Sequence, residues 1–176
     1  MKQNILVVSY DYDYSKQIAS KLAGLFSMHL FDELELFEFD HMPRSYEEIF
    51  ETLGKEYIYK KLRSIVKSEV EFDDAVFVAD ISFADYSEDL FYKLKLSNFV
   101  VLLTKPIELE MEELKNKVYK TKAEKELFSS NRKTLEVRED KIIKNLADII
   151  VDADNLTDEQ IIEEIVDKIK SYYNVN

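Results

Sequence analysis

Cysteine is absent from the 176-residue sequence, which therefore contains no disulfide bond, no thiolate metal ligand and no thiol nucleophile. Glycine and proline are scarce, with two residues of each, so no loop can be rich in glycine. Histidine is scarce as well, and His29 and His41 offer little material for imidazole chemistry. Any functional site therefore has to be built mainly from carboxylates, ammonium groups, hydroxyls and phenols.

Positive charge is in deficit, because 24 lysines and arginines face 36 aspartates and glutamates, which gives a formal net charge of −12. That balance argues against binding to a nucleic acid backbone. Long apolar runs are also missing. The run Ile5–Val8 is too short for the core of a signal peptide, and no segment approaches the roughly 20 apolar residues of a membrane span. We therefore expect a cytoplasmic protein that contacts neither membranes nor nucleic acids.

The composition that remains is typical of a globular protein, with 46% apolar and 12% aromatic residues, and it suits a single domain over residues 1–176. Four short apolar runs are rich in strand-forming residues: Ile5–Val8, Ala75–Ala79, Phe99–Leu103 and Ile149–Val151. Because these runs are continuous rather than alternating, they predict strands that are covered on both faces.

Segments with helical spacing of apolar residues separate these runs: Ser15–Ser27, Tyr46–Val70, Phe83–Leu96 and Pro106–Leu127. A last helix opens at Thr157, with Gln160 three residues later in the arrangement of a capping box. The alternation of strands and helices predicts an α/β fold, a three-layer α/β/α sandwich around a central parallel sheet. The stretch Lys115–Lys133 carries seven lysines or arginines with weak periodicity, so we expect a lid or an exposed helical region there.

Short motifs follow one another in a distinctive order along the chain. The run Ile5–Val8 is followed by a turn, by Ile18–Ala23 and by Phe31-Asp32. Phe50–Glu56 reads Phe-x-x-x-Gly-Lys-Glu, and Leu146-Ala147-Asp148 precedes the last strand and helix. This order resembles that of the shikimate kinases, which carry Phe-x-x-x-Gly-Glu-x-x-Phe-Arg at the middle position. The resemblance covers nearly the whole chain. It implies a P-loop kinase topology and, for an active member, ATP, magnesium and a small-molecule substrate.

The resemblance places a phosphate loop after the first strand, and the residues aligned with it are Ser9, Tyr10, Asp11, Tyr12, Asp13, Tyr14, Ser15, Lys16 and Gln17. A Walker A loop, G-x-x-x-x-G-K-[ST], needs glycines so that backbone N–H groups converge on the phosphates, and a lysine that adds positive charge. Here Ser9 and Tyr14 replace the glycines, and Ser15 replaces the lysine. A tyrosine forced into the left-handed conformation costs about 1–2 kcal/mol. The aligned loop is therefore degenerate.

Charge also opposes nucleotide binding at this loop. Asp11 and Asp13 would face the triphosphate, with a repulsion of roughly 4 kcal/mol for two unit charges in close contact near a surface. Lys16 is a displaced candidate for the missing lysine, but a shift of one residue along a helix rotates a side chain by about 100°. We therefore expect a pseudokinase that binds neither ATP nor another cofactor and that has a binding or regulatory role.

Few of the other family positions match. The resemblance assigns the aspartate that aligns with Asp32 to the magnesium environment. It also places Arg138 within one residue of an arginine that binds the substrate in the family. Asp80 follows an apolar run in the manner of a Walker B strand, where it would orient magnesium through water. Tyr59 stands in place of another substrate arginine. If the protein is instead an active small-molecule kinase with a non-standard loop, Lys16 and Asp32 are its candidate catalytic residues, and Asp32 and Asp80 its candidate metal residues.

The aspartates of the turn carry a second enzymatic hypothesis. Asp11 and Asp13 are separated by one residue after the first strand, and Thr104 follows a later strand. This arrangement resembles the motifs of haloacid-dehalogenase-type phosphatases, in which two such aspartates act as nucleophile and acid/base. The second alternative is therefore a magnesium-dependent phosphatase that uses Asp11 and Asp13.

The tyrosines of the turn carry a third, non-enzymatic hypothesis. Tyr10, Tyr12 and Tyr14 alternate with acids, and a turn so rich in tyrosine suits contact with a protein or small-molecule ligand of unknown identity. The same side chains can instead pack inward and plug the vacated nucleotide cleft. The sequence leaves both roles open, and it does not define an oligomeric state.

Overall fold

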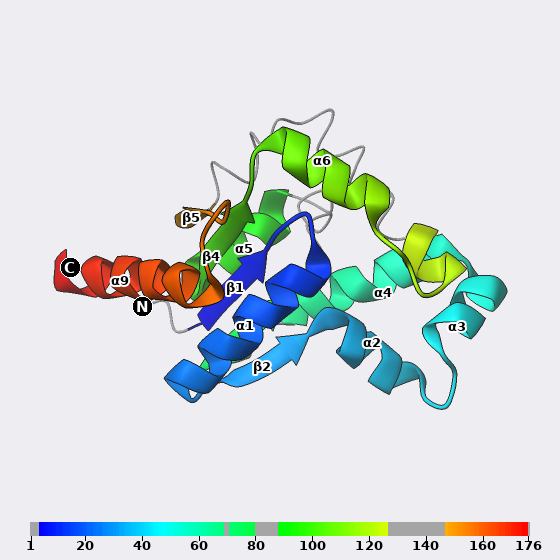
Figure 1. The fold of residues 1–176 in the computed structure, drawn as a ribbon. Coiled ribbons are helices and arrows are strands. Elements are labelled where there is room, and N and C mark those ends of the chain that lie inside the picture. Colours follow the sequence, from blue (N-terminus) through cyan, green and yellow to red (C-terminus); the bar gives the residue numbers. More distant parts are fainter. Residues whose placement is uncertain (1–3, 69–70, 80–87, 127–146, 176) are drawn as a thin grey trace.

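The computed structural model describes residues 4–68, 71–79, 88–126 and 147–175, and it is built around a five-stranded sheet (Figure 1). The strands are β1 (Asn4–Val8), β2 (His29–Asp32), β3 (Ala75–Val78), β4 (Asn98–Thr104) and β5 (Ile149–Asp152). They lie in the order β2-β3-β1-β4-β5, and each neighbouring pair is parallel. The predicted α/β fold with a central parallel sheet is confirmed, and each of the four predicted strands is found within one residue of its expected ends.

The helices that connect the strands are α1 (Tyr12–Phe26), α2 (Glu33–His41), α3 (Tyr46–Leu53), α4 (Lys55–Ser68), α5 (Glu88–Ser97), α6 (Ile107–Asn116) and α9 (Asp158–Val175). Side chains alternate along β1, so that Ile5 packs into one buried cluster and Leu6 into another. The first cluster includes Ile18 of α1 and Ile161 of α9, and the second includes Leu94 of α5. Figure 1 accordingly shows α1 in front of the sheet and α5 behind it. Both faces are covered, which explains the continuous apolar runs and confirms the three-layer prediction.

The prediction of one long helix over Tyr46–Val70 is wrong in one respect. The chain forms two helices there, α3 and α4, which meet at Gly54. Gly54 has a φ of 78°, a conformation that interrupts a helix and that glycine adopts without steric cost. One of the two glycines in the chain therefore serves to turn the backbone between two helices.

The helix expected over Pro106–Leu127 is shorter than predicted. α6 ends at Asn116, residues 117–121 are not helical, and a further helical turn covers residues 122–126. The basic stretch Lys115–Lys133 therefore begins at the end of α6 and continues through a loop, and its residues from 127 onward lie outside the described part of the chain. Of the helix expected over Phe83–Leu96, residues 83–87 also lie outside that part, and α5 covers the remainder.

Two elements, β2 and α2, were not predicted. β2 is the last strand at one side of the described sheet, and its two interior residues, Leu30 and Phe31, are only half-buried. In α2 the side chain of Phe37 is buried whereas that of Phe39 is 73% exposed, so the apolar residues do not form a single stripe. Neither element therefore has the hydrophobic periodicity that marks the others.

The last helix, α9, begins at the predicted capping box. The Thr157 N–H donates to Oε1 of Gln160 at 2.9 Å, and the Gln160 N–H donates to Oγ1 of Thr157 at 3.4 Å. Within the four described segments, no helix is both long and apolar enough to cross a membrane.

Asn4 ties the two central strands together at their amino ends. Its buried carboxamide accepts a hydrogen bond from the Ala75 N–H at 3.0 Å and donates one to the Phe72 carbonyl at 2.6 Å. These partners lie at the entrance to β3, 68 and 71 residues further along the chain. The side chain thereby satisfies backbone groups at the start of β3 that would otherwise lack a partner.

Replacement of Asn4 with alanine is expected to lower the free energy of unfolding by about 1–3 kcal/mol, because a buried N–H and a carbonyl lose their partner. Urea denaturation followed by circular dichroism measures the change. The matched control is Asn116→Ala at an exposed position at the end of α6, for which a change within about 0.5 kcal/mol is expected. Equal losses in the two variants would contradict the role given to Asn4.

Candidate functional site

The turn between β1 and α1 is short and is closed by its own hydroxyl groups. It consists of Ser9, Tyr10 and Asp11, and α1 begins at Tyr12. Oγ of Ser9 donates to the Asp11 carbonyl at 2.5 Å and accepts from the Asp11 N–H at 3.2 Å. Oγ of Ser15, buried in the first turns of α1, donates to Oγ of Ser9 at 2.8 Å. Residues that align with the second half of a phosphate loop therefore belong to a helix.

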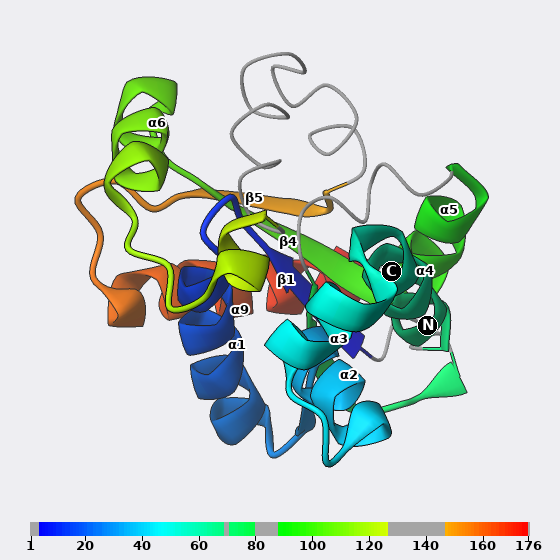
Figure 2. The same ribbon diagram turned by 90° about the vertical axis from the view of Figure 1, so that its right-hand side faces the viewer.

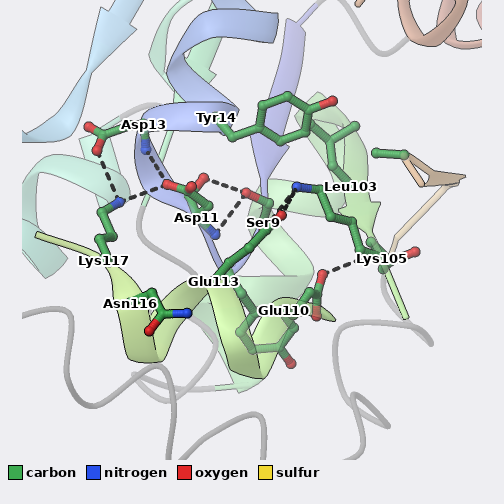
Figure 3. Close-up of a pocket in the computed structure, with 13 residues that line it drawn as sticks. Ser9, Asp11, Asp13, Tyr14, Leu103, Lys105, Glu110, Glu113, Asn116 and Lys117 are labelled. Carbon is green, nitrogen blue, oxygen red and sulfur yellow. Dashed lines mark hydrogen bonds and ion pairs between the residues drawn. The ribbon is translucent and has the colours of Figure 1, made fainter. Parts of the chain in front are cut away.

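The N-terminus of α1 already holds an anion, the side chain of Asp11. This residue is the N-cap, and its carboxylate accepts a hydrogen bond from the Asp13 N–H at 3.1 Å. Nζ of Lys117 lies 2.7 Å from Oδ1 of Asp11 and 3.0 Å from Oδ2 of Asp13 (Figure 3). Burial alone would lower the pKa of Lys117, but the hydrogen bonds and charges of the two aspartates outweigh it and raise the pKa.

Two of the three tyrosines of this region point into the protein. Tyr10 is 2% exposed and Tyr12 is 4% exposed, and they belong to the clusters on opposite faces of the sheet. Oη of Tyr12 donates to Oδ1 of Asp32 at 2.7 Å. Burial, followed by the charges of Glu33 and Asp32, raises the pKa of Tyr12 well above its usual value. Tyr14 is only half-buried and has the Lys105 ammonium 5.2 Å from the centre of its ring.

A cavity of about 350 Å³ lies beside this turn, at the carboxyl edge of the sheet. Figures 1 and 2 both show α6 next to the β1–α1 turn, and α6 supplies one wall. The residues that line it are Ser9, Tyr10, Asp11, Asp13, Tyr14, Leu103, Thr104, Lys105, Glu110, Glu113, Asn116, Lys117 and Ala153. Because four of these residues are acids and two are lysines, the cavity is unfavourable for a phosphate group.

Lys16 and Asp32 meet on the other side of α1. Nζ of Lys16 lies 2.8 Å from Oδ2 of Asp32 and 2.6 Å from Oε1 of Glu35. Burial alone would lower the pKa of Lys16, but these two carboxylates outweigh it and raise the pKa. Asp32 is 3% exposed and caps α2, where its Oδ1 accepts the N–H groups of Leu34 and Glu35 at 2.9 and 3.0 Å. Both carboxylate oxygens of Asp32 thus have partners within the chain.

A second cavity of about 310 Å³ lies beside this pair. The residues that line it are Tyr12, Asp13, Lys16, Asp32, Leu34, Glu35, Glu38, Tyr46, Lys120, Thr121 and Glu124. Five of them are acids and two are lysines, so this cavity is also unfavourable for an anionic ligand.

The structure therefore distributes the aligned loop residues over two cavities. Ser9, Tyr10, Asp11 and Tyr14 line the first, Tyr12 and Lys16 line the second, and Asp13 lines both. Gln17 lies apart from both, and its Nε2 donates to Oδ2 of Asp158 at 2.5 Å. Asp80 and Arg138 lie outside the described residues. In the part of the chain that is described, no three histidines, aspartates or glutamates are grouped so that they could hold a metal ion.

Sequence reasoning missed the residues that α6 and its flanks bring to the first cavity. Lys105, Glu110, Glu113 and Lys117 all line it, and Lys117 contacts an aspartate 106 residues earlier in the chain. The one available signal was the density of lysines after residue 115, which does not indicate which lysine points inward.

Comparison with known proteins identifies a family and a fold. The profile of the shikimate kinase family matches residues 16–170. The shikimate kinase of Acinetobacter baumannii, solved in complex with shikimate, is 16% identical, with a TM-score of 0.75 over 98% of this chain and 95% of that one. The enzyme of Aquifex aeolicus is 19% identical, with a TM-score of 0.76 over 97% and 98%. The enzyme of Bacteroides thetaiotaomicron is 17% identical, with a TM-score of 0.70 over 97% and 98%. No curated protein sequence matches the chain.

Replacement of Lys117 with glutamine is expected to lower the free energy of unfolding at pH 7 by about 1–2 kcal/mol, because two aspartates lose a charged hydrogen-bond donor. A lysine whose pKa is raised by folding stabilises the protein below its unfolded pKa of about 10.4, and this contribution is lost as the pH rises through the raised value. The difference between wild type and variant should therefore narrow above that pH. Urea denaturation at pH 7 and at alkaline pH tests this. Lys115→Gln, at an exposed position, is the control, and a difference that persists unchanged at alkaline pH would contradict the assignment.

Replacement of Asp32 with alanine is expected to destabilise the protein by about 2–4 kcal/mol, because α2 loses its cap and Lys16 and Tyr12 lose a buried partner. The control is Asp40→Ala near the other end of the same helix, where the side chain is exposed and a change within about 0.5 kcal/mol is expected. Thermal and urea denaturation measure the stability of both variants. If Asp32→Ala is as stable as the control, Asp32 does not have a structural role.

Proposed function

This chain belongs to the shikimate kinase family, and we propose that it is a member without nucleotide binding, which acts as a binding or regulatory protein. The observation that carries the proposal is the contact of Lys117 with Asp11 and Asp13 at the N-terminus of α1. In P-loop proteins this helix end receives the phosphates of the nucleotide. Here a carboxylate and its counter-ion, both from the chain itself, take that place.

The polarity of the turn supports the same proposal. A triphosphate approaching α1 meets Asp11 and Asp13 first, and the Lys117 ammonium, which is in contact with both, is already paired with them. Glu110 and Glu113 add two more carboxylates to the walls of the cavity. The family match begins at residue 16, after the positions that align with the loop glycines and lysine. Loss of the loop thus agrees with conservation of the rest of the fold.

The burial of Tyr10 and Tyr12 favours the hypothesis that these two side chains plug the nucleotide cleft. Burial of Tyr10 and Tyr12 removes their rings from any surface that a partner could touch, and it fills space next to the turn. Tyr14 differs, because it remains half-buried and lines the 350 Å³ cavity. A ligand of this cavity would therefore contact Tyr14 and the polar walls, and it would be a small molecule without a triphosphate.

The alternative of an active kinase has one supporting observation. Lys16 and Asp32, the two candidate catalytic residues, lie 2.8 Å apart and share a cavity. In that alternative Lys16 would leave Asp32 and Glu35 in order to contact a phosphate. A phosphatase that uses Asp11 and Asp13 has less support, because Asp11 caps α1 and both carboxylates are paired with Lys117.

Titration of the protein with MgATP by isothermal calorimetry is expected to give no saturable heat up to millimolar nucleotide. The double variant Asp11→Asn/Asp13→Asn is expected to remain silent as well, because removal of charge does not supply the converging amides of a glycine loop. Micromolar binding to the wild type would overturn the proposal, and its loss in Lys16→Ala would identify a kinase. Binding that appears only in the double variant would show that charge alone excludes the nucleotide. Magnesium-dependent hydrolysis of a phosphomonoester that Asp11→Asn abolishes would support the phosphatase.

A further inference from the structure

A groove of about 800 Å³ lies between β5 and α9. The residues that line it are Phe99, Asp148, Ile149, Gln160, Glu163, Glu164, Asp167, Lys168, Ser171 and Tyr172. Phe99 and Ile149 stand at the amino ends of β4 and β5, whereas the two cavities described above lie at the carboxyl edge. The groove is therefore at the opposite end of the sheet from the β1–α1 turn, and it plays no part in the proposed function.

One stripe of α9 forms a wall of the groove. Its lining residues recur at intervals of three and four positions from Gln160 to Ser171, which places them along a single face of the helix. At 1.5 Å per residue, the wall from Gln160 to Tyr172 is about 18 Å long. An extended peptide rises by about 3.3 Å per residue, so this length accommodates a segment of about five residues.

The charge of the wall is not balanced within the described chain. Lys168 is the one basic residue of the lining, and its ammonium lies 2.6 Å from Glu164 and 2.8 Å from the Ile150 carbonyl. Glu163 and Asp167 are exposed, and among the described residues neither forms an ion pair. They are also four positions apart on the helix, where like charges destabilise it by a few tenths of a kcal/mol. A cationic partner would relieve that repulsion.

The floor of the groove is apolar and aromatic. Phe99 and Ile149 are buried beneath it, and Tyr172 lies at its end with 43% of its surface exposed. The rings of Phe99 and Tyr172 are perpendicular, with their centres 5.0 Å apart. Aromatic rings of this kind bind the aliphatic stems of lysine and arginine and attract their charged ends.

We propose that this groove docks a short basic segment of a partner protein, with two lysines or arginines against Glu163 and Asp167 and an apolar side chain against Tyr172. Charge complementarity selects a basic partner, and the same charge excludes a nucleic acid. The extent of the groove selects a peptide over a single amino group. The inference holds whether or not the carboxyl edge of the sheet binds a nucleotide.

The test uses the full chain and a fluorescein-labelled peptide in which lysine alternates with glycine and phenylalanine. Binding of this peptide is measured by fluorescence anisotropy at about 0.15 M salt. The wild type is expected to bind it. The double variant Glu163→Lys/Asp167→Lys is expected to bind at least about tenfold more weakly, and the neutral variant Glu163→Gln/Asp167→Asn should lie between the two. The matched control is Glu108→Lys/Glu112→Lys on α6, an exposed pair with the same spacing and charge change, for which affinity within about twofold of wild type is expected.

Three outcomes would overturn the proposal. The first is the absence of binding to the wild type. The second is equal weakening by the groove variant and the α6 variant, which would show attraction to overall charge. The third is displacement of the peptide by spermidine at lower concentration than by unlabelled peptide, which would identify a free polyamine as the occupant. Circular dichroism of each variant verifies folding, and the exposed positions of both pairs make loss of the fold unexpected.

Discussion

Under the proposed function, the contact of Lys117 with Asp11 and Asp13 at the start of α1 decides what the carboxyl edge of this sheet can bind. The N-terminus of a helix presents unpaired N–H groups that attract an anion. In this chain the Asp11 carboxylate provides that anion, and the Lys117 ammonium, 2.7 Å away, neutralises it. Because Ser9 closes the turn through its own hydroxyl, the backbone does not spread into a loop around a ligand. In the function proposed above, a short turn, a cap and a counter-ion take the place of the parts of a phosphate site.

Asp32 likewise has partners within the chain. Its carboxylate caps α2, accepts the Tyr12 hydroxyl and pairs with Lys16, so it joins α1 to the β2–α2 connection. Buried groups linked in this way are costly to separate, because each leaves a desolvated partner behind. Under the proposed function, residues that align with catalytic positions of the family have become part of the framework that fixes α1 and α2 against the sheet.

Local pattern explains both what the sequence predicted and what it missed. Strands such as β1 and β4 were predictable because burial on two faces requires unbroken apolar runs. In β2, the half-buried Leu30 and Phe31 gave no such signal. The lining of the first cavity was predictable in part, for those of its residues that lie close together in sequence between Ser9 and Tyr14. It was not predictable for Lys117, because tertiary packing of α6 brings this side chain to Asp11 across 106 residues and no short-range pattern encodes that distance.

Different residues determine the fold and the chemistry at the carboxyl edge of the sheet. The chemistry at that edge can therefore change while the fold stays the same. The two buried clusters and the parallel ladder need apolar side chains such as Ile5 and Leu6, and of Ser9, Tyr10 and Asp11 only Tyr10 contributes to them. The sheet therefore does not depend on glycines in the turn. If the carboxyl edge excludes a nucleotide, as proposed, the amino end of the sheet is still available to a partner, and an acidic wall and an aromatic floor meet there. The net charge of −12 would draw basic partners toward the molecule from a distance, and Glu163 and Asp167, which form no ion pair among the described residues, would then decide where they dock.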